Sequence, residues 1–252
     1  MEKSIEQFLK DNNISYVTIK LIKEGISNAN YLIDNRYVLK VPYDRRFSRV
    51  RKETVDLENI CFKNFLSPEV VAYDEENGFL LTKYIPNLRI LNAQNTNYFE
   101  IKNIVEAIKK YHRIKADIPK LDYEKLLDSY RLKINPKERI YNSKLTYSNI
   151  FEGEYELSHF DLVDNFDLVS LLGENRFSKE IEEMIIDIYF DNKKEKNEFL
   201  AKKDELLAIA DLLWYHWAKA RSLSPFADKK KIYLSIAKDK KESLEQYLKT
   251  SK

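Results

Sequence analysis

The sequence is poor in three features, and each scarcity excludes a class of structure. Its 252 residues include one cysteine, Cys61, which lies in an apolar stretch, is expected to be buried, and cannot form a disulfide within the chain. No apolar run approaches the ~18–20 residues of a membrane-spanning helix. Only four glycines are present, and we expect each to lie where the backbone requires it. With 44% hydrophobic residues, the chain can bury a large apolar core.

Charged residues are abundant, but the two signs nearly cancel. They make up 33% of the chain, and the formal net charge at pH 7 is only +2. Lysine runs such as 193–196 and 229–231 alternate with acidic residues elsewhere, as on solvated helix faces. This pattern gives little support to nucleic-acid binding. The first six residues lack the apolar segment of a signal peptide, so we expect a cytoplasmic protein.

The spacing of apolar residues divides the chain into two parts. The first part has strand-like alternation at 16–21, 31–33, 37–41, 70–73 and 79–84, and helical spacing at 2–11 and 49–65. The second part has helical spacing at 98–114, 121–133, 168–173, 178–191, 195–222 and 226–249, with strand character only at 140–160. We therefore predict a bilobal α+β fold. A small antiparallel sheet lobe with one inserted helix would cover residues 1–87, and a larger helical lobe residues 88–252.

Two features of the first part are suited to holding phosphate. Residues 25–31 (Gly-Ile-Ser-Asn-Ala-Asn-Tyr) lie between predicted strands, where backbone amides can cradle phosphate, although the run also fits an ordinary hairpin loop. Lys40 lies in the otherwise apolar strand 37–41. A lysine so placed can hold nucleotide phosphates when it pairs with a glutamate of the following helix, or it can simply point to solvent. Glu53 is the natural partner, with Glu58 second.

The last predicted strand of the first part leads into the connection to the second part. Residues 78–86 read Gly-Phe-Leu-Leu-Thr-Lys-Tyr-Ile-Pro. Backbone groups of Lys83, Tyr84 and Ile85 could there form hydrogen bonds with an adenine base. Loop, lysine strand and connecting strand thus follow one another in the order that a nucleotide-binding lobe uses.

A third motif lies at 142–159, which reads Asn-Ser-Lys-Leu-Thr-Tyr-Ser-Asn-Ile-Phe-Glu-Gly-Glu-Tyr-Glu-Leu-Ser-His. Phosphotransferase catalytic loops run His-x-Asp-x-x-x-x-Asn, followed by a turn and a strand that ends in a metal-binding Asp. With Asn149 aligned to the Asn of that motif, Asn142 takes the position of the His and Lys144 that of the catalytic Asp. His159 takes the position of the metal-binding Asp.

In this order, the segments resemble the bacterial choline kinase and aminoglycoside phosphotransferase-like group over most of the chain. That group's Gly-x-Thr-Asn-x-Asn-Tyr loop resembles 25–31, and its lysine strand resembles 37–40. Its helix ending in Leu-His, its Phe-Asp-Leu-Ala segment and its Trp-x-x-Trp helix resemble 107–112, 166–172 and 213–218. The resemblance implies a protein-kinase-like fold that binds ATP. In active members it also implies Mg²⁺-dependent phosphorylation of a hydroxylated amine such as choline or ethanolamine.

The departures from the group fall on the residues that carry the chemistry. In active members one Asp orients the substrate hydroxyl, the Asn binds one Mg²⁺, and a second Asp bridges the metals. Free lysine titrates near pH ~10.4, so Lys144 would not act as a general base at neutral pH. His159 is a poor ligand for Mg²⁺, which prefers oxygen donors. We therefore predict a catalytically degenerate protein that keeps a nucleotide- or anion-binding cleft, because the added positive charge repels a dication and attracts phosphate.

Two alternatives stay open. The sequence His-Phe-Asp at 159–161 also fits His-x-Asp, but the next Asn follows four residues after the Asp instead of five. In the preferred alignment, Asp161 could replace the lost metal ligand, with Asp164 or Asp167 nearby. The protein would then be an active ATP-dependent kinase that holds Mg²⁺ with Asn149 and Asp161.

The residues near the C-terminal helices allow a substrate role or a structural one. Asp167 could position the catalytic-loop backbone, face a cationic substrate, or simply begin a helix. Trp214 and Trp217 could line a quaternary-ammonium pocket through cation–π contacts, or belong to the core. His112 and His216 are expected to pack structurally.

The candidate site residues therefore form three groups. The predicted nucleotide-binding residues are Gly25, Ser27, Asn28, Lys40, Glu53, Lys83, Tyr84 and Ile85. The predicted catalytic-loop residues are Asn142, Lys144, Asn149 and Asp161, with His159 at the position of the lost metal ligand. The predicted substrate-binding residues are Asp167, Trp214 and Trp217.

Overall fold

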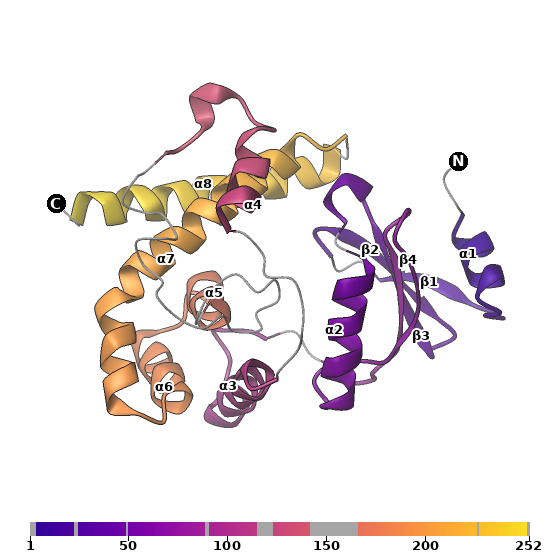
Figure 1. Ribbon diagram of the computed structural model, residues 1–252, viewed down its shortest axis with the longest axis horizontal. Coiled ribbons are helices and arrows are strands. Elements are labelled where there is room, and N and C mark those ends of the chain that lie inside the picture. Colours follow the sequence, from indigo (N-terminus) through magenta and orange to yellow (C-terminus); the bar gives the residue numbers. More distant parts are fainter. Residues whose placement is uncertain are drawn as a thin grey trace. The chain divides into compact units, whose positions relative to one another are not determined.

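The computed structural model describes residues 4–22, 25–48, 50–88, 91–114, 123–141, 166–225 and 227–250 (Figure 1). Helices and one β-sheet make up these residues, which confirms the predicted α+β class. They separate into two compact units, one up to residue 88 and one from residue 91 onward. Among the described residues, no helix combines the length and the apolar character needed to span a bilayer.

The first unit is built on a five-stranded antiparallel sheet. Its strands are β1 (Ile19–Ile22), β2 (Asn28–Ile33), β3 (Tyr37–Pro42), β4 (Val70–Asp74) and β5 (Phe79–Lys83). Their spatial order is β1-β2-β3-β5-β4. In this register Lys40 of β3 lies directly opposite Asn30 of β2 and Leu80 of β5.

Helix α1 (Ile5–Asp11) packs on one face of this sheet. The apolar cluster on that face contains Phe8, Leu9, Ile33, Leu39, Ala72, Phe79 and Leu81. Phe8 and Leu9 are completely buried, and the Phe8 ring meets the Phe79 ring edge to face with centroids 5.4 Å apart. Burying each such side chain contributes roughly 1.5–3 kcal/mol, so α1 is an integral part of the first unit's core.

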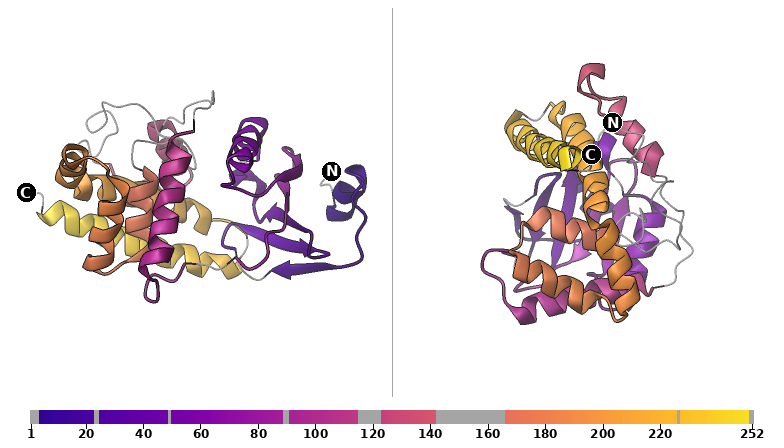
Figure 2. Two further views of the ribbon diagram at one scale, coloured as in Figure 1. Left: turned by 90° about the horizontal axis from the view of Figure 1, so that it is seen from below. Right: turned by 90° about the vertical axis from the view of Figure 1, so that its left-hand side faces the viewer.

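Helix α2 (Lys52–Lys63) connects β3 to β4 and lies on the other side of the strands from α1 (Figures 1 and 2). Its buried side chains are Val55 and Cys61. The sequence-based expectation that Cys61 is buried is thus confirmed. Burial raises the pKa of the Cys61 thiol to about 11, which keeps it protonated and unreactive at neutral pH.

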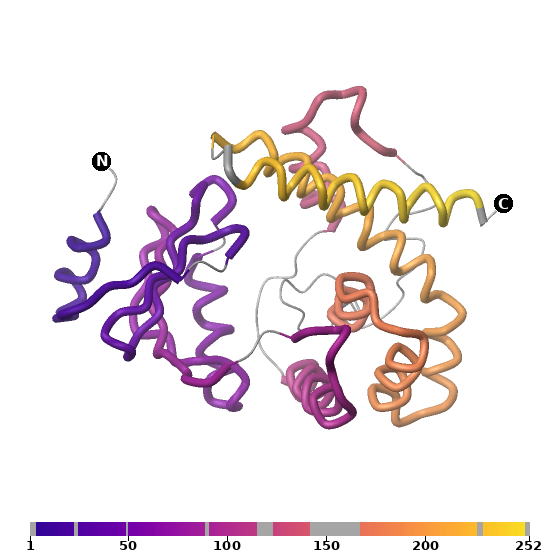
Figure 3. The backbone as a smooth tube through the Cα atoms, turned by 180° about the vertical axis from the view of Figure 1, so that it is seen from behind, coloured from indigo at the N-terminus to yellow at the C-terminus, as the bar shows by residue number. Residues whose placement is uncertain are grey.

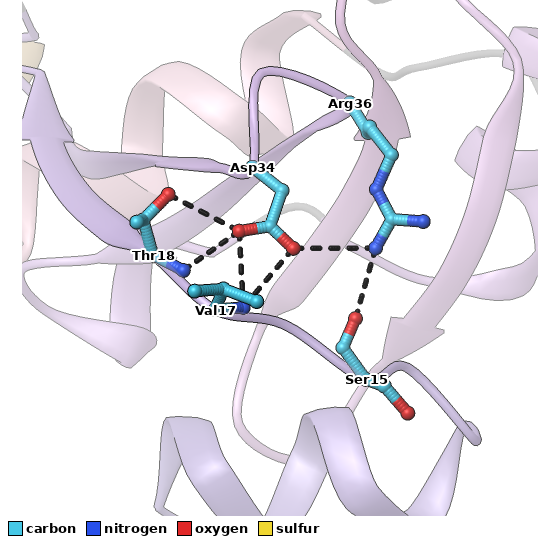
Figure 4. Close-up of polar contacts among 5 residues, drawn as sticks. All are labelled: Ser15, Val17, Thr18, Asp34 and Arg36. Carbon is cyan, nitrogen blue, oxygen red and sulfur yellow. Dashed lines mark hydrogen bonds and ion pairs between the residues drawn. The ribbon is translucent and has the colours of Figure 1, made fainter.

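A carboxylate in the β2–β3 turn ties the N-terminal segment to the sheet (Figure 4). Asp34 Oδ1 accepts hydrogen bonds from the N–H groups of Val17 and Thr18, at 3.0 and 2.7 Å. Arg36 Nη2 donates to Asp34 Oδ2 at 3.3 Å and to the Ser15 carbonyl at 2.9 Å. The hydrogen bond from the Thr18 backbone, with smaller contributions from its neighbours, lowers the pKa of Asp34.

The second unit is helical. Its helices are α3 (Tyr98–His112), α4 (Tyr123–Arg131), α5 (Phe166–Asn175), α6 (Lys179–Tyr189), α7 (Lys193–Ser222) and α8 (Ala227–Thr250). The long helix α7 packs against α8, α5 and α4, while α3 packs against α6 (Figures 1 and 3). Helix α7 is thus the central element of this unit, and most side chains in its C-terminal half are buried.

A buried lysine connects three of these helices. Lys240 Nζ of α8 lies 2.6 Å from Glu174 Oε1 of α5 and 3.0 Å from Asp211 Oδ1 of α7. Burial opposes the charged form of Lys240, but the two carboxylates outweigh burial and raise its pKa. Losing either partner would leave charge only partly compensated in the core, so this cluster constrains how α5, α7 and α8 pack.

The predicted elements are present within a few residues of their expected bounds, with one difference before β2. Residues 28–30 were expected in a loop, but they form the first half of β2. Pairing with β3 explains this, since Asn28 lies opposite Pro42 and Asn30 opposite Lys40. The strand predicted at 140–160 lies almost entirely outside the described residues.

Candidate functional site

The candidate residues fall into three groups according to where they lie. Asn142, Lys144, Asn149, His159 and Asp161 lie outside the described residues. The predicted nucleotide-binding residues belong to the first unit, and Asp167, Trp214 and Trp217 belong to the second. The alignment of the catalytic loop therefore stays a prediction from the sequence.

The alternation of β3 places Lys40 on the face of the sheet that α1 does not cover. Leu39 is completely buried in the cluster with α1, and Val41 packs against the same cluster. Side chains of successive strand residues point to opposite faces, so Lys40 points away from α1. Its neighbour on that face is Leu80, which is buried, and Lys40 is itself half-buried. Within the described part of the chain, the Lys40 ammonium has neither an ion pair nor a hydrogen bond.

Two glutamates of α2 were considered as partners for Lys40, and the helix presents them differently. Glu58 lies three residues from both Val55 and Cys61, so it shares their buried face and is half-buried. Glu53 lies two residues before Val55, which places it away from that face, and its side chain is exposed. The predicted Lys40–Glu53 ion pair is not among the contacts of the described residues. The rotation of α2 favours Glu58 as the inward-facing acid.

The loop before β2 brings a glycine and an asparagine close together. Gly25 has φ +152°, and a Cβ atom added there would lie 2.5 Å from the Asn28 carbonyl oxygen and 2.8 Å from Asn30 Nδ2. Only glycine permits this approach. The Ser27 carbonyl accepts a hydrogen bond from the Tyr43 N–H at 3.2 Å, which ties the loop to the end of β3.

Asn30 is a site candidate that the sequence analysis did not assign. It lies directly opposite Lys40, and such pairs have Cβ atoms about 4.5–5.5 Å apart on the same face. Gly25, Asn30 and Lys40 therefore form one polar patch, in which an amide lies beside an ammonium. The alternation of strand residues could have shown that Asn30 and Lys40 each point to one face of their strand. Only the β2–β3 register shows that Asn30 lies opposite Lys40.

The strand that ends at residue 83 uses its backbone donors within the first unit. The Lys83 N–H donates to the Glu69 carbonyl at 2.9 Å, and the Tyr84 N–H donates to the Arg36 carbonyl at 2.8 Å. Lys83 Nζ lies 4.9 Å from the centroid of the Tyr37 ring, which packs against the cluster with α1. The Lys83 side chain therefore points away from the face that carries Lys40.

Ile85 keeps a backbone N–H that donates to no acceptor in the described residues. The residue after it is Pro86, which has no N–H. Of the three predicted adenine-binding positions, Ile85 is thus the one whose backbone donor is not already used.

In the second unit, a buried histidine holds Asp167 near the start of α5. His112 Nε2 lies 3.1 Å from Asp167 Oδ2, and His112 Nδ1 lies 2.8 Å from the Tyr189 hydroxyl. An ionised carboxylate only accepts hydrogen bonds, so in a neutral imidazole Nε2 carries the proton and Nδ1 accepts from Tyr189. Residues from α3, α5 and α6 thus fix the orientation of one carboxylate.

The aromatic residues of α7 are packed by the chain's own side chains. The Trp217 ring meets those of Trp214 and Tyr233 edge to face, with centroids 5.4 and 5.5 Å apart. The Arg221 guanidinium lies 5.9 Å from the Trp217 centroid and 5.6 Å from that of Tyr233. The Trp217 ring is therefore already near a cation of the chain itself, the Arg221 guanidinium. Trp214 is half-buried, and its Nε1 has no hydrogen-bond partner in the described part of the chain.

The described residues contain no cluster of three or more histidine, cysteine, aspartate or glutamate side chains that could hold a metal ion. The predicted Mg²⁺ ligands, Asn149 and Asp161, lie outside those residues. The proposal that they bind a metal rests on the sequence alone, in which Asn149 would supply an amide oxygen and Asp161 a carboxylate.

Neither a protein-family profile nor the sequence of a characterised protein matches the chain. Solved structures, in contrast, are similar over nearly its whole length. Choline kinase LicA from Streptococcus pneumoniae aligns with a TM-score of 0.67 and 13% identity over 96% of this chain and 99% of that one, and it has also been solved in complex with AMP. A Plasmodium vivax ethanolamine kinase aligns with a TM-score of 0.66 and 11% identity over 88% and 81% of the two chains.

Another similar structure is the gentamicin complex of APH(2″)-IIa. It aligns with a TM-score of 0.58 and 16% identity over 98% of this chain and 97% of that one. The chain therefore has the kinase-like fold that choline and ethanolamine kinases share with aminoglycoside phosphotransferases.

Proposed function

We propose that the protein binds a nucleotide or another phosphate-bearing anion through its first unit, and that its ability to transfer phosphate is impaired. The observation that carries the binding proposal is the polar patch of Gly25, Asn30 and Lys40. A half-buried ammonium without an internal counter-charge is available to pair with an anionic ligand. The fold supports the same proposal, since LicA, which shares it, has been solved in complex with AMP.

Each element of the patch has a distinct role in this proposal. Lys40 would pair with phosphate oxygens, and Asn30 would donate a second hydrogen bond from the neighbouring strand. The backbone at Gly25, Ser27 and Asn28 would bring further N–H groups to the phosphates.

Two further residues would complete the nucleotide site. Glu58, on the inward face of α2, replaces Glu53 as the acid proposed to orient Lys40. The unused N–H of Ile85 would bond to the base. Lys83 and Tyr84 are proposed only as flanking residues, because their own N–H groups are already used.

The proposed loss of transfer follows from the sequence of the catalytic loop. An ammonium at position 144 and an imidazole at position 159 would replace two carboxylates that active kinases use. Repulsion between a dication and a lysine within ~5 Å amounts to several kcal/mol at an effective dielectric of ~20. Anion binding that does not depend on Mg²⁺ is then physically easier than Mg²⁺-dependent transfer.

A second candidate function is an active kinase for a hydroxylated amine. The observation in its favour is the similarity in fold to choline and ethanolamine kinases. In this case Asn149 and Asp161 would hold Mg²⁺. Asp167 would orient the loop, and Trp214 would be the better candidate for a substrate wall, because Trp217 is already packed against Arg221.

Thermal-shift titration with ATP, with and without Mg²⁺, tests the binding proposal. A ligand at one hundred times its dissociation constant stabilises the folded state by about 2.7 kcal/mol, which is readily measured. We expect a shift that Mg²⁺ does not enhance, that Lys40→Ala abolishes and that Lys83→Ala preserves. Lys83 is the matched control, because it lies on the same sheet but points to the other face. No shift in the wild type, or an equal shift in Lys40→Ala, would refute the proposal.

Release of ADP with choline or ethanolamine as acceptor separates the two candidate functions. The degenerate protein should give no turnover above an acceptor-free control. Robust turnover that Asp161→Asn abolishes would instead establish the active kinase.

A further inference from the structure

The chain that leads up to residue 142 is held against α7 by side chains of a single helical turn. This segment comprises the short 3₁₀ helix η2 (Pro136–Glu138) and the non-helical residues 139–141. The Tyr215 hydroxyl donates to the Glu138 carbonyl at 2.8 Å. Lys219 Nζ lies 2.5 Å from Glu138 Oε1. Both contacts fix the beginning of the segment to α7.

His216, on the same turn, holds the next part of the segment by its backbone. The Ile140 N–H donates to His216 Nε2 at 3.1 Å, and His216 Nδ1 lies 2.8 Å from the Leu212 carbonyl. A carbonyl can only accept, so Nδ1 carries the proton and Nε2 is the acceptor for Ile140. The His216 side chain is completely buried. Both ring nitrogens are therefore satisfied, as a buried imidazole requires.

Arg131 of α4 also binds the backbone of Ile140. Its Nη2 donates to the Ile140 carbonyl at 3.0 Å, and its guanidinium lies 4.6 Å from the centroid of the Tyr141 ring. Asp128 Oδ1, 3.0 Å from Arg131 Nη1, orients the guanidinium. The N–H and the C=O of Ile140 thus both bind buried side chains, one from α7 and one from α4.

We propose that His216 and Arg131 are positioning residues that fix the backbone of Ile140, just before the segment 142–149 in the sequence. Ile140 precedes residue 142 by two positions in the sequence. Apolar side chains would pack α7 against α4 equally well, whereas only a hydrogen-bonding side chain can fix one irregular backbone unit. The inference rests on the proposed function in one respect, namely that 142–149 corresponds to a catalytic loop.

This proposal gives the aromatic turn of α7 a role other than that of a substrate wall. Tyr215, His216 and Lys219 hold the segment before residue 142, while Trp217 is packed with Arg221 and Tyr233. Side chains of this turn thus support a backbone segment, and Trp214 stays the candidate for a substrate wall.

Hydrogen exchange of backbone amides in the full-length protein tests the inference without any ligand. In His216→Leu the acceptor is lost, and we expect the Ile140 amide to exchange at least about tenfold faster. In His216→Gln a side-chain oxygen can accept the same bond, and we expect exchange within about threefold of the wild type. Val105→Ala, a cavity variant in the completely buried part of α3, controls for general loosening.

The outcomes separate this inference from the proposed function. Faster exchange of the Ile140 amide in His216→Leu, and its absence in Val105→Ala, supports the positioning role. Unchanged exchange there, or equal acceleration in both variants, overturns it. ATP titration of the wild type tests nucleotide binding separately, so failure of that proposal would not be mistaken for failure of this one.

Discussion

In the first unit, Lys40 and Glu58 are half-buried charges with no side-chain partner in the described residues. In the second unit, by contrast, Asp167 and His216 are held by named partners from neighbouring helices. Unpaired charges at half-buried positions cost free energy that an ionic ligand can recover. Side chains that are fully engaged serve to hold other groups in place. The comparison therefore supports the proposal that the sheet unit binds the ligand while the helical unit holds other groups in place.

The largest expected effect is a loss of stability in the first unit, measured separately from the stability of the second. Phe8→Ala removes a completely buried ring from the core between α1 and the sheet, and should cost about 3–5 kcal/mol in the free energy of unfolding. Hydrogen exchange of β2 and β3 amides measures the loss in the first unit. Trp fluorescence follows the second unit, because both tryptophans of the chain, Trp214 and Trp217, lie there.

The matched control for Phe8→Ala is Phe65→Ala. The Phe65 side chain is 91% exposed, so its removal should change stability by no more than about 0.5 kcal/mol. Equal destabilisation by the two substitutions would contradict the packing of α1 described above.

The second effect tests whether His216 is a neutral acceptor. Burial lowers the pKa of His216 to about 4, with a smaller contribution from Arg131, whereas Asp128 and the Leu212 carbonyl act in the opposite direction. An unfolded histidine titrates near pH ~6.5, so between these values the unfolded chain binds more protons. The stability contribution is therefore complete above pH ~6.5, falls as the pH drops toward 4, and changes no further below that.

The size of this pH effect is about 3 kcal/mol, and denaturant unfolding at a series of pH values measures it. His216→Gln is the control, because glutamine does not titrate but can accept from the Ile140 N–H. Subtracting its curve removes the contribution of all carboxylates. Parallel curves for wild type and His216→Gln between pH 4 and 6.5 would show that His216 is not held neutral.

The third effect sharpens the choice of partner for Lys40. Glu58→Gln should weaken ATP binding by up to about tenfold, or 1.4 kcal/mol, because a neutral amide orients an ammonium less strongly than a carboxylate does. Glu53→Gln should leave the affinity unchanged, since Glu53 is exposed and away from the buried face of α2. Equilibrium titration of both variants decides between them, and the reverse order of effects would return the role to Glu53.

The smallest effect concerns the support of Asp167. Tyr189→Phe removes only the hydroxyl that lies 2.8 Å from His112 Nδ1, and should cost about 1 kcal/mol in the free energy of unfolding. Tyr98→Phe, at a position 48% exposed, is the matched control and should have almost no effect. Urea unfolding monitored by Trp fluorescence reports on both variants. A cost as small in Tyr189→Phe as in the control would mean that the hydroxyl does not support His112.

The helices and strands were predictable because they depend on local patterns. Alternation identified the strands around Lys40, and 3.6-residue spacing identified α3 to α8. The exception, residues 28–30, looks like a loop because asparagine is common in turns. Pairing with β3 outweighs that preference. The register between β2 and β3 depends on contacts between separate segments, which a local sequence pattern does not show.

The candidate site was predictable only in part. The sequence placed Lys40 correctly on a strand, but it could not show that Asn30 lies opposite or that Glu58 faces inward. Similarly, Trp217 could be read as a pocket wall until Arg221 and Tyr233 were found packed against it. These facts depend on strand register and helix rotation, which packing sets.

By itself, the sequence determined the α+β class, the order of the elements and the kinase-like motifs, because periodicity and turn residues act over a few neighbouring positions. Only the tertiary structure decided which side chains are already paired with others in the chain. The physical reason is that a polar group's partner, unlike its helical or strand conformation, is supplied by residues far away in the chain. His216 and Ile140, 76 residues apart, meet only because α7 packs beside the segment before residue 142.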